Sequence, residues 1–285
     1  DAFSVPRDIL PQVKPTLSQL GHYKHKGRAI PIVCAIGDQQ AAVCGTGAFE
    51  EGVAALNLGT GIFFLANTGS KQLRVDGILT SAGWNSDKKS CSYLLEGTVH
   101  SASTVFDWLN SLGLAFDFKD IDGMCRSSQN PALMLPALGG IGAPYWDYVT
   151  PTTMSALMPQ TKKEDLVRGA ADGLCHMAAE IYLCMRQGGV GVTEVKASGG
   201  LSNIDYFLQT SADLLQTKVS KVAESEATAL GAAYLAAQFL GAELPQWRSF
   251  GVEKSFVPSI TAQDALSRHN QWRGFVNANR KFFQS

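Results

Sequence analysis

Residues 53–67 read VAALNLGTGIFFLAN, in which two apolar runs flank a Gly-Thr-Gly turn at 59–61. Each run has the length and composition of a buried β-strand, so we predict strands over 53–58 and 62–67. Glycine on either side of Thr60 allows main-chain amides and one hydroxyl to approach a phosphate. The alternative for this turn is a tight β-hairpin that binds nothing.

Two other apolar runs end in a similar way. The run at 30–36 leads into Gly37 and Asp38, and the run at 195–197 leads into Ser-Gly-Gly at 198–200. We therefore predict that Asp38 lies at the carboxyl end of a buried strand, which is where α/β sheets place their chemistry. An acid without a neighbouring cation can act as a general base, although a helix N-cap is the simpler alternative.

The remaining pattern alternates strands and helices as α/β proteins do. A capping box at Thr161 and Glu164 opens the longest predicted helix, and Gly241 ends another. Small residues over 229–237 predict that this second helix lies close against the sheet. We predict strands over 30–37, 53–58, 62–67, 91–96, 132–136, 194–198 and 217–222. We predict helices over 39–48, 99–112, 162–187, 203–216, 226–240 and 262–283.

Composition narrows the class of protein. The chain has 285 residues with 45% apolar residues, enough for one compact domain with a large core. A net charge of −1 gives no basis for binding nucleic acid or anionic lipid. The six cysteines include no C-x-x-C pair, which favours reduced thiols in a cytoplasmic protein. No signal peptide or 18-residue apolar stretch is visible, so we expect no membrane association.

Six motifs, in this order and spacing, resemble the carboxyl-terminal domain of the FGGY-type carbohydrate and polyol kinases, most closely their glycerol kinase members. Each motif is weak alone, and the set is specific. The motifs are IGDQQAA at 36–42, LGTG at 58–61, LEG at 95–97, PALGGIGAPYWD at 136–147, SGG at 198–200 and EATALGAAYL at 226–235.

The resemblance implies an α/β fold of the ribonuclease H-like type found in actin and hexokinase, with a mixed sheet flanked by helices. It covers only the carboxyl-terminal half of such a kinase. The family's first half carries an Asp-x-Gly-Thr hairpin for phosphates and metal, together with an Arg-Glu pair and an aromatic residue for the substrate. We expect 1–27 to be the segment connecting the halves and 28–285 to be the carboxyl-terminal domain, with the amino-terminal half as its partner.

The resemblance also implies an activity: ATP-dependent phosphorylation of a small polyol or sugar, with glycerol favoured by the Gln39-Gln40 pair. Asp38 would take the proton of the attacking hydroxyl, while Gln39 and Phe63 would line the substrate. No metal ligand is assigned here, because Mg²⁺ would be held mainly by the other half. A homodimer is possible. The nucleotide would be bound by Gly59, Thr60, Gly61, Ser103, Gly199, Gly200 and Asn203.

Two departures from the family pattern fall in the nucleotide site. Ser103 and Asp107 stand where glycerol kinases have a glycine and a glutamine, and an inward-facing Asp107 would repel phosphate. Ile204 aligns with the adenine-side asparagine, although Asn203 is one residue away. These changes keep an alternative open, in which the chain is a non-catalytic nucleotide- or partner-binding module derived from a sugar kinase.

Overall fold

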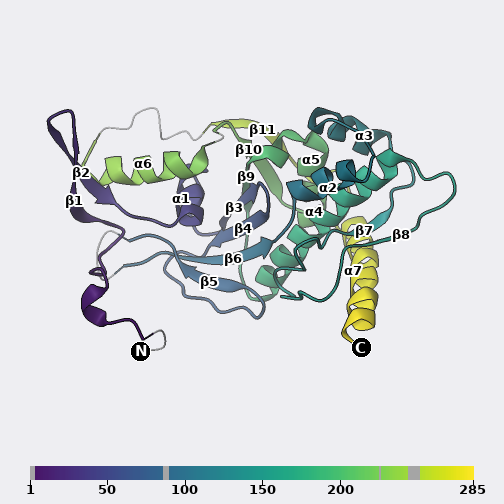
Figure 1. Ribbon diagram of the computed structural model, residues 1–285, viewed down its shortest axis with the longest axis horizontal. Coiled ribbons are helices and arrows are strands. Elements are labelled where there is room, and N and C mark those ends of the chain that lie inside the picture. Colours follow the sequence, from purple (N-terminus) through teal and green to yellow (C-terminus); the bar gives the residue numbers. More distant parts are fainter. Residues whose placement is uncertain (1–3, 86–89, 225, 243–250) are drawn as a thin grey trace.

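A seven-stranded mixed sheet forms the centre of the computed structural model, which describes residues 4–85, 90–224, 226–242 and 251–285 (Figure 1). The strand order across the sheet is β11-β10-β9-β3-β4-β6-β5. The strands are β3 (Val53–Leu58), β4 (Ile62–Asn67), β5 (Leu79–Ala82), β6 (Tyr93–Val99), β9 (Glu194–Ser198), β10 (Lys218–Val222) and β11 (Val252–Phe256).

The direction of the strands decides where the loops gather. Strand β3 is antiparallel to β4, which is antiparallel to β6, whereas β9 and β10 are parallel to β3. Because β3 and β9 are adjacent and parallel, the turns that follow them, at 59–61 and 199–200, lie at the same edge of the sheet.

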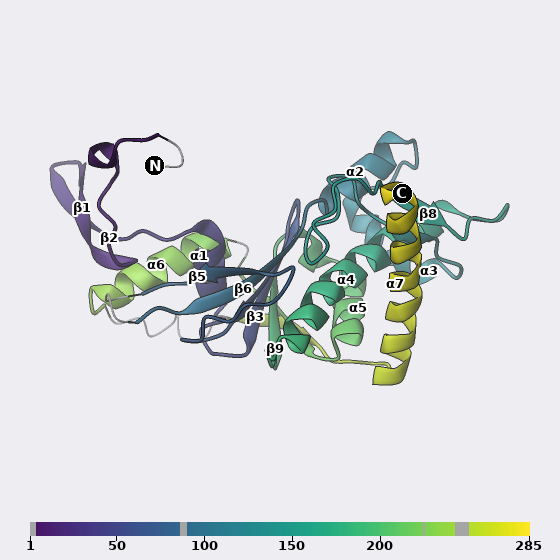
Figure 2. The same cartoon turned by 90° about the horizontal axis from the view of Figure 1, so that it is seen from below.

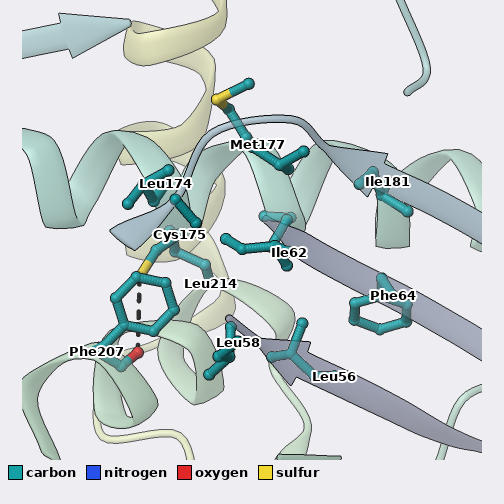
Figure 3. Close-up of a cluster of buried hydrophobic side chains, with 14 of the residues drawn as sticks. Leu56, Leu58, Ile62, Phe64, Leu174, Cys175, Met177, Ile181, Phe207 and Leu214 are labelled. Carbon is teal, nitrogen blue, oxygen red and sulfur yellow. Dashed lines mark hydrogen bonds between the residues drawn. The ribbon is translucent and has the colours of Figure 1, made fainter. Parts of the chain in front are cut away.

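Alternate residues of the central strands face a large core on one side of the sheet. Leu56, Leu58, Ile62 and Phe64 are fully buried there against α4 (Lys163–Gln187). Figure 3 shows these side chains meeting those of α4 and of α5 (Asp205–Leu215). The helical spacing of apolar residues in α4, among them Leu174, Met177 and Ile181, places one face of the helix on the sheet.

The opposite face of the sheet packs on α1 (Asp38–Gly45), whose Val43 joins Ala55 and Leu65 in a second cluster. Helix α6 (Ala227–Phe239) lies on the outside of α1 (Figure 1, Figure 2). Two glycines allow the close approach: a Cβ added at Gly45 would lie 2.9 Å from the Cα of Ala227, and one at Gly231 only 2.7 Å from the Gly45 nitrogen. The small residues of α6 therefore pack on α1 and not on the sheet, which corrects our expectation.

The strand predicted over 30–37 forms, but it is neither buried nor part of the main sheet. The segment forms β2 (Arg28–Cys34), which pairs with β1 (Leu17–His25) in a separate two-stranded sheet. Ile30 and Ile32 are 46% and 44% exposed. A continuous apolar run marks a strand with hydrophobic side chains, but it does not determine which strand becomes its neighbour.

The start of α4, the end of α6 and one short strand lie at or close to their predicted positions. The N-cap of α4 is Lys162, whose amide donates to Asp165 Oδ2 at 2.9 Å. This is one half of a capping box, one residue later than predicted, and a lysine side chain has no acceptor to form the other half. Gly241 has a positive φ of 65° after the end of α6, as a C-terminal glycine should. The strand predicted over 132–136 is confirmed as β7 (Leu133–Leu135).

The carboxyl-terminal helix α7 (Ala262–Gln284) is fixed to α4 by a buried polar network. His269 contacts His176 through the two Nδ1 atoms at 3.0 Å and Glu180 through Nε2 at 2.8 Å. Trp272 donates its indole N–H to the Met134 carbonyl. The other elements are β8 (Thr153–Ser155), which pairs with β7, α2 (Ser103–Ser111), α3 (Ile121–Ser127) and the 3₁₀ helices η1 (Arg7–Ile9), η2 (Phe118–Asp120) and η3 (Gly200–Asn203).

The six cysteines are free, three of them buried and three of intermediate exposure. In the part of the chain that the structure describes, no helix combines the length and the apolar character that crossing a membrane requires.

Candidate active site

Two glycine turns meet at the carboxyl ends of β3 and β9. Gly199 has a φ of 91°, and a Cβ there would lie 2.6 Å from the Leu58 carbonyl oxygen and 2.9 Å from Asn57 Oδ1. No residue larger than glycine fits this position without moving the end of β3. The structure thus brings together the two glycine-rich turns that the sequence places 140 residues apart, between Gly59 and Gly199.

The turn at 59–61 also contacts the start of α2. The amide of Ala102 donates to the Thr60 carbonyl at 2.7 Å, and the amide of Ser103 donates to the Gly59 carbonyl at 3.3 Å. Gly61 is equally constrained, because a Cβ there would lie 2.7 Å from the Val99 carbonyl oxygen. Ser103 therefore stands beside Thr60, whose side chain is exposed to solvent.

A cavity of about 290 Å³ opens next to Gly199 and Gly200. Asn203 lines it and is exposed, whereas Ile204 is only 2% exposed and belongs to the core. The residue available to a ligand here is Asn203, so the substitution at Ile204 does not reach the cavity. The lining residues are Ser198, Gly199, Gly200, Ser202, Asn203, Lys221, Val222, Ala223, Glu224, Glu226 and Glu253.

Asp38 is the first residue of α1, and the N-cap is Gly37. The Oδ1 atom of Asp38 accepts a hydrogen bond from the Gln39 amide at 2.8 Å. It accepts none from the amides of the second and third residues that follow, as an N-cap side chain would. The N-cap alternative for Asp38 is therefore wrong. The carboxylate is exposed at the helix N-terminus, where the helix dipole favours a negative charge. It follows β2 and is not at the end of a strand of the main sheet, contrary to our expectation.

Gln39, in α1, and Phe63, in β4, lie on the side of the main sheet that α1 covers. Phe63 is the second residue of β4, two residues after the glycine turn, and it packs against the cluster that includes Val43 of α1. Gln39 is half-buried, and its Oε1 is enclosed without a hydrogen-bond partner among the described residues. A buried acceptor without a donor is suited to a ligand that brings one.

Sequence reasoning assigned no role to Glu96, which lies on this face in β6. Its Oε2 accepts from the Ser81 hydroxyl at 3.5 Å, and Ser81 in turn accepts from Gln40 Nε2 at 3.4 Å. Burial raises the pKa of the Glu96 carboxyl, and the negative charge of Asp38 raises it further against the Ser81 hydrogen bond. The LEG motif was the only signal for this residue in the sequence.

Two other features bear on ligand binding. Asp107 is exposed on α2, so its charge is screened by solvent. Among the described residues, no three histidine, cysteine, aspartate or glutamate side chains gather as they would around a metal ion.

Comparison with known proteins identifies the architecture. A family model described as the C-terminal domain of the FGGY family of carbohydrate kinases matches residues 54–239. The glycerol kinase of Aeromonas hydrophila is 32% identical over 295 residues, which is 99% of this chain and 58% of that protein. The glycerol kinase of Bacillus licheniformis is 33% identical over 99% of this chain and 59% of its own length. The chain thus spans under three fifths of these relatives.

Solved structures agree with the sequence relatives. Plasmodium falciparum glycerol kinase with ADP superposes with a TM-score of 0.88 at 26% identity, over 95% of this chain and 56% of that one. A xylulose kinase from Rhodospirillum rubrum gives 0.84 at 16% identity over 99% of this chain and 59% of that one, which shows the shared fold alone. The ribonuclease H-like fold that we expected is confirmed. The chain belongs to the FGGY family of carbohydrate kinases, of which it carries the C-terminal domain.

Proposed function

We propose that this chain supplies the carboxyl-terminal half of an ATP-dependent kinase that phosphorylates a small polyol or sugar, with glycerol favoured. The observation that carries the proposal is the meeting of two glycine turns, after β3 and β9, beside α2 and a cavity of about 290 Å³. Main-chain amides and hydroxyls in such turns are typical donors to phosphate oxygens. The family membership and the glycerol kinase relatives support the same reading.

The nucleotide would lie across both turns. Thr60 and Ser103, together with the glycines at 59, 61, 199 and 200, would contact its phosphates. Asn203 would meet the base in the adjoining cavity, whose lining includes Glu224, Glu226 and Glu253. Lys221 also lines the cavity and pairs with Glu253, which leaves Glu224 and Glu226 as its net negative charge, so we place the uncharged base and not the phosphates beside these two glutamates.

Asp38 would act as the general base. As the substrate hydroxyl attacks the γ-phosphorus, its proton passes to an Asp38 carboxylate oxygen, a new P–O bond forms, and the bond to the β,γ-bridging oxygen breaks to release ADP. The exposed carboxylate at the start of α1 can receive this proton. Gln39 and Phe63 would orient the substrate, the former through its unpaired Oε1 acceptor.

The metal and the rest of the substrate site would come from another polypeptide half. We assign Mg²⁺ mainly to the amino-terminal half, in which the family carries its Asp-x-Gly-Thr hairpin, and derive no step through it. Residues 1–27 would connect the halves, and 28–285 would form the domain; the boundary falls in the turn between β1 and β2. A homodimer stays a prediction.

The test is Asp38→Asn in the kinase assembled with its amino-terminal half. Turnover should fall by about 10²–10⁴-fold, the usual contribution of a positioned base, while the dissociation constant for ADP stays within a factor of about two. Asp117→Asn, which removes an exposed carboxylate at the start of η2, is the matched control. Unchanged turnover per folded molecule would remove Asp38 from catalysis and favour the non-catalytic module.

A further inference from the structure

We propose that Glu96 is a positioning residue for Asp38: through Ser81 and Gln40 it holds the first turn of α1 against the sheet. This inference rests on the proposed function of Asp38 as the base. It concerns a side chain that takes no part in the catalytic step drawn above.

The geometry begins with the strand pairing. Glu96 of β6 stands opposite Leu65 of β4 and Leu79 of β5, on the face of the sheet that packs on α1. Ser81, two residues along β5, reaches the Glu96 carboxylate at 3.5 Å and Gln40 at 3.4 Å. A polar chain thus runs from the sheet to the residue that lies two positions after Asp38.

These hydrogen bonds are long, as catalytic contacts often are before a substrate and a closing domain tighten them. Even so, these hydrogen bonds connect three separate elements, β6, β5 and α1, at the point where α1 begins. A rigid sheet is a better reference for a catalytic group than the exposed β2 that precedes it in the sequence.

The same contacts act on the Glu96 carboxyl. Burial raises its pKa, the Ser81 hydrogen bond lowers it, and the negative charge of Asp38 raises it. Because a carboxyl group keeps an acceptor oxygen for the Ser81 hydroxyl in either protonation state, the anchoring of α1 does not depend on the charge of Glu96.

Substitutions in the assembled kinase test the anchoring. Glu96→Ala removes the acceptor for Ser81, and we expect kcat to fall about fivefold with KM for ATP unchanged. Glu96→Gln keeps the shape and an acceptor oxygen, so its kcat should stay close to the parental value. Ser81→Ala breaks the same chain and should lower kcat to a similar extent. Glu50→Gln removes an exposed carboxylate elsewhere and should change neither kcat nor KM.

The outcomes are distinguishable from a failure of the proposed function. If Asp38→Asn abolishes turnover but Glu96→Ala and Ser81→Ala leave kcat as in the parent, the inference about Glu96 is overturned while Asp38 keeps its role. If Asp38→Asn has no effect, the proposed base itself fails. Should Glu96→Ala fold poorly by circular dichroism, Ser81→Ala decides alone, and a parental kcat would overturn the inference.

Discussion

The contact between α1 and α6 fixes the position of α1, and with it the position of Asp38 at the start of this helix. One methyl group added at the contact tests how much turnover depends on that position. Gly231 of α6 lies against the backbone of α1, where an added Cβ would be 2.7 Å from the Gly45 nitrogen and 2.8 Å from the Ala41 carbonyl carbon. Both neighbours are main-chain atoms, which cannot turn aside as a flexible side chain can. Gly231→Ala must therefore push the two helices apart.

The magnitude follows from these distances. Favourable heavy-atom contacts lie at about 3.5–4.0 Å, and the Ala41 carbonyl oxygen would be closer to the added Cβ than either of these atoms, so the helices must separate by at least about 1 Å. Overpacking of this kind costs about 1–3 kcal/mol, against about 1 kcal/mol gained when alanine replaces glycine inside a helix. We expect a net loss of unfolding free energy of about 0–2 kcal/mol, and a deficit of about 1–3 kcal/mol relative to an alanine substitution without the clash. Since a 1 Å misplacement of a catalytic group can cost about 10²-fold in rate, turnover should fall more than stability.

Urea unfolding of the chain and turnover of the assembled kinase measure the two effects. The control is Gly274→Ala on α7, where nothing lies within 4 Å of the added Cβ, so the unfolding free energy should rise by up to about 1 kcal/mol with turnover unchanged. If Gly231→Ala unfolds at the same urea concentration as Gly274→Ala, the close contact does not exist and the reasoning is refuted.

Three further predictions follow from individual side chains. Burial raises the pKa of Glu194, but hydrogen bonds from Ser220, Lys218 and Lys196 outweigh it and lower the pKa to about 2. This stabilisation is present above the ordinary pKa of 4.5 and is lost as the pH falls toward 2, so the deficit of Glu194→Gln in urea unfolding should shrink between pH 7 and pH 3. Asp107→Asn should change ATP affinity by less than about twofold in calorimetry, because the side chain is exposed and screened; a tenfold gain would mean that the parent site is compromised. The 285-residue chain alone should transfer no phosphate to glycerol, and measurable product from the purified chain would contradict the need for an amino-terminal half.

Local sequence sufficed for much of the fold. Strands β3, β4 and β9 have the predicted bounds of 53–58, 62–67 and 194–198. Strands β3 and β4 are mainly apolar runs on either side of a glycine turn, and β9 alternates buried Val195 and Ala197 with polar residues before two glycines. Strands β1, β5 and β11 were not predicted. They are short or carry several polar and exposed side chains, so no periodic signal marked them.

In the candidate site, too, some features could be predicted from the sequence and others depend on the tertiary structure. The glycines at 59, 61 and 199 were identified from sequence, since a turn that follows a buried strand depends on neighbouring residues alone, and the family motifs pointed to Asp38 and Phe63. That Gly199 lies against Leu58 and that Asn203, not Ile204, lines the cavity depend on β9 pairing in parallel with β3. The order of strands in a sheet is a property of the whole chain.

Glu96 and Gly231 mark what only the tertiary structure decided. In the sequence, Glu96 is one acid in an apolar strand, and Gly231 is one of several small residues in a helix. Their meaning comes from partners far along the chain: Ser81 and Asp38 for the first, Ala41 and Gly45 for the second. Composition and spacing determine which segments become strands, helices and glycine turns, because those choices rest on local backbone preferences and burial. Which side chains then face one another is set by the packing of helices across the sheet, where contacts between distant residues decide the outcome.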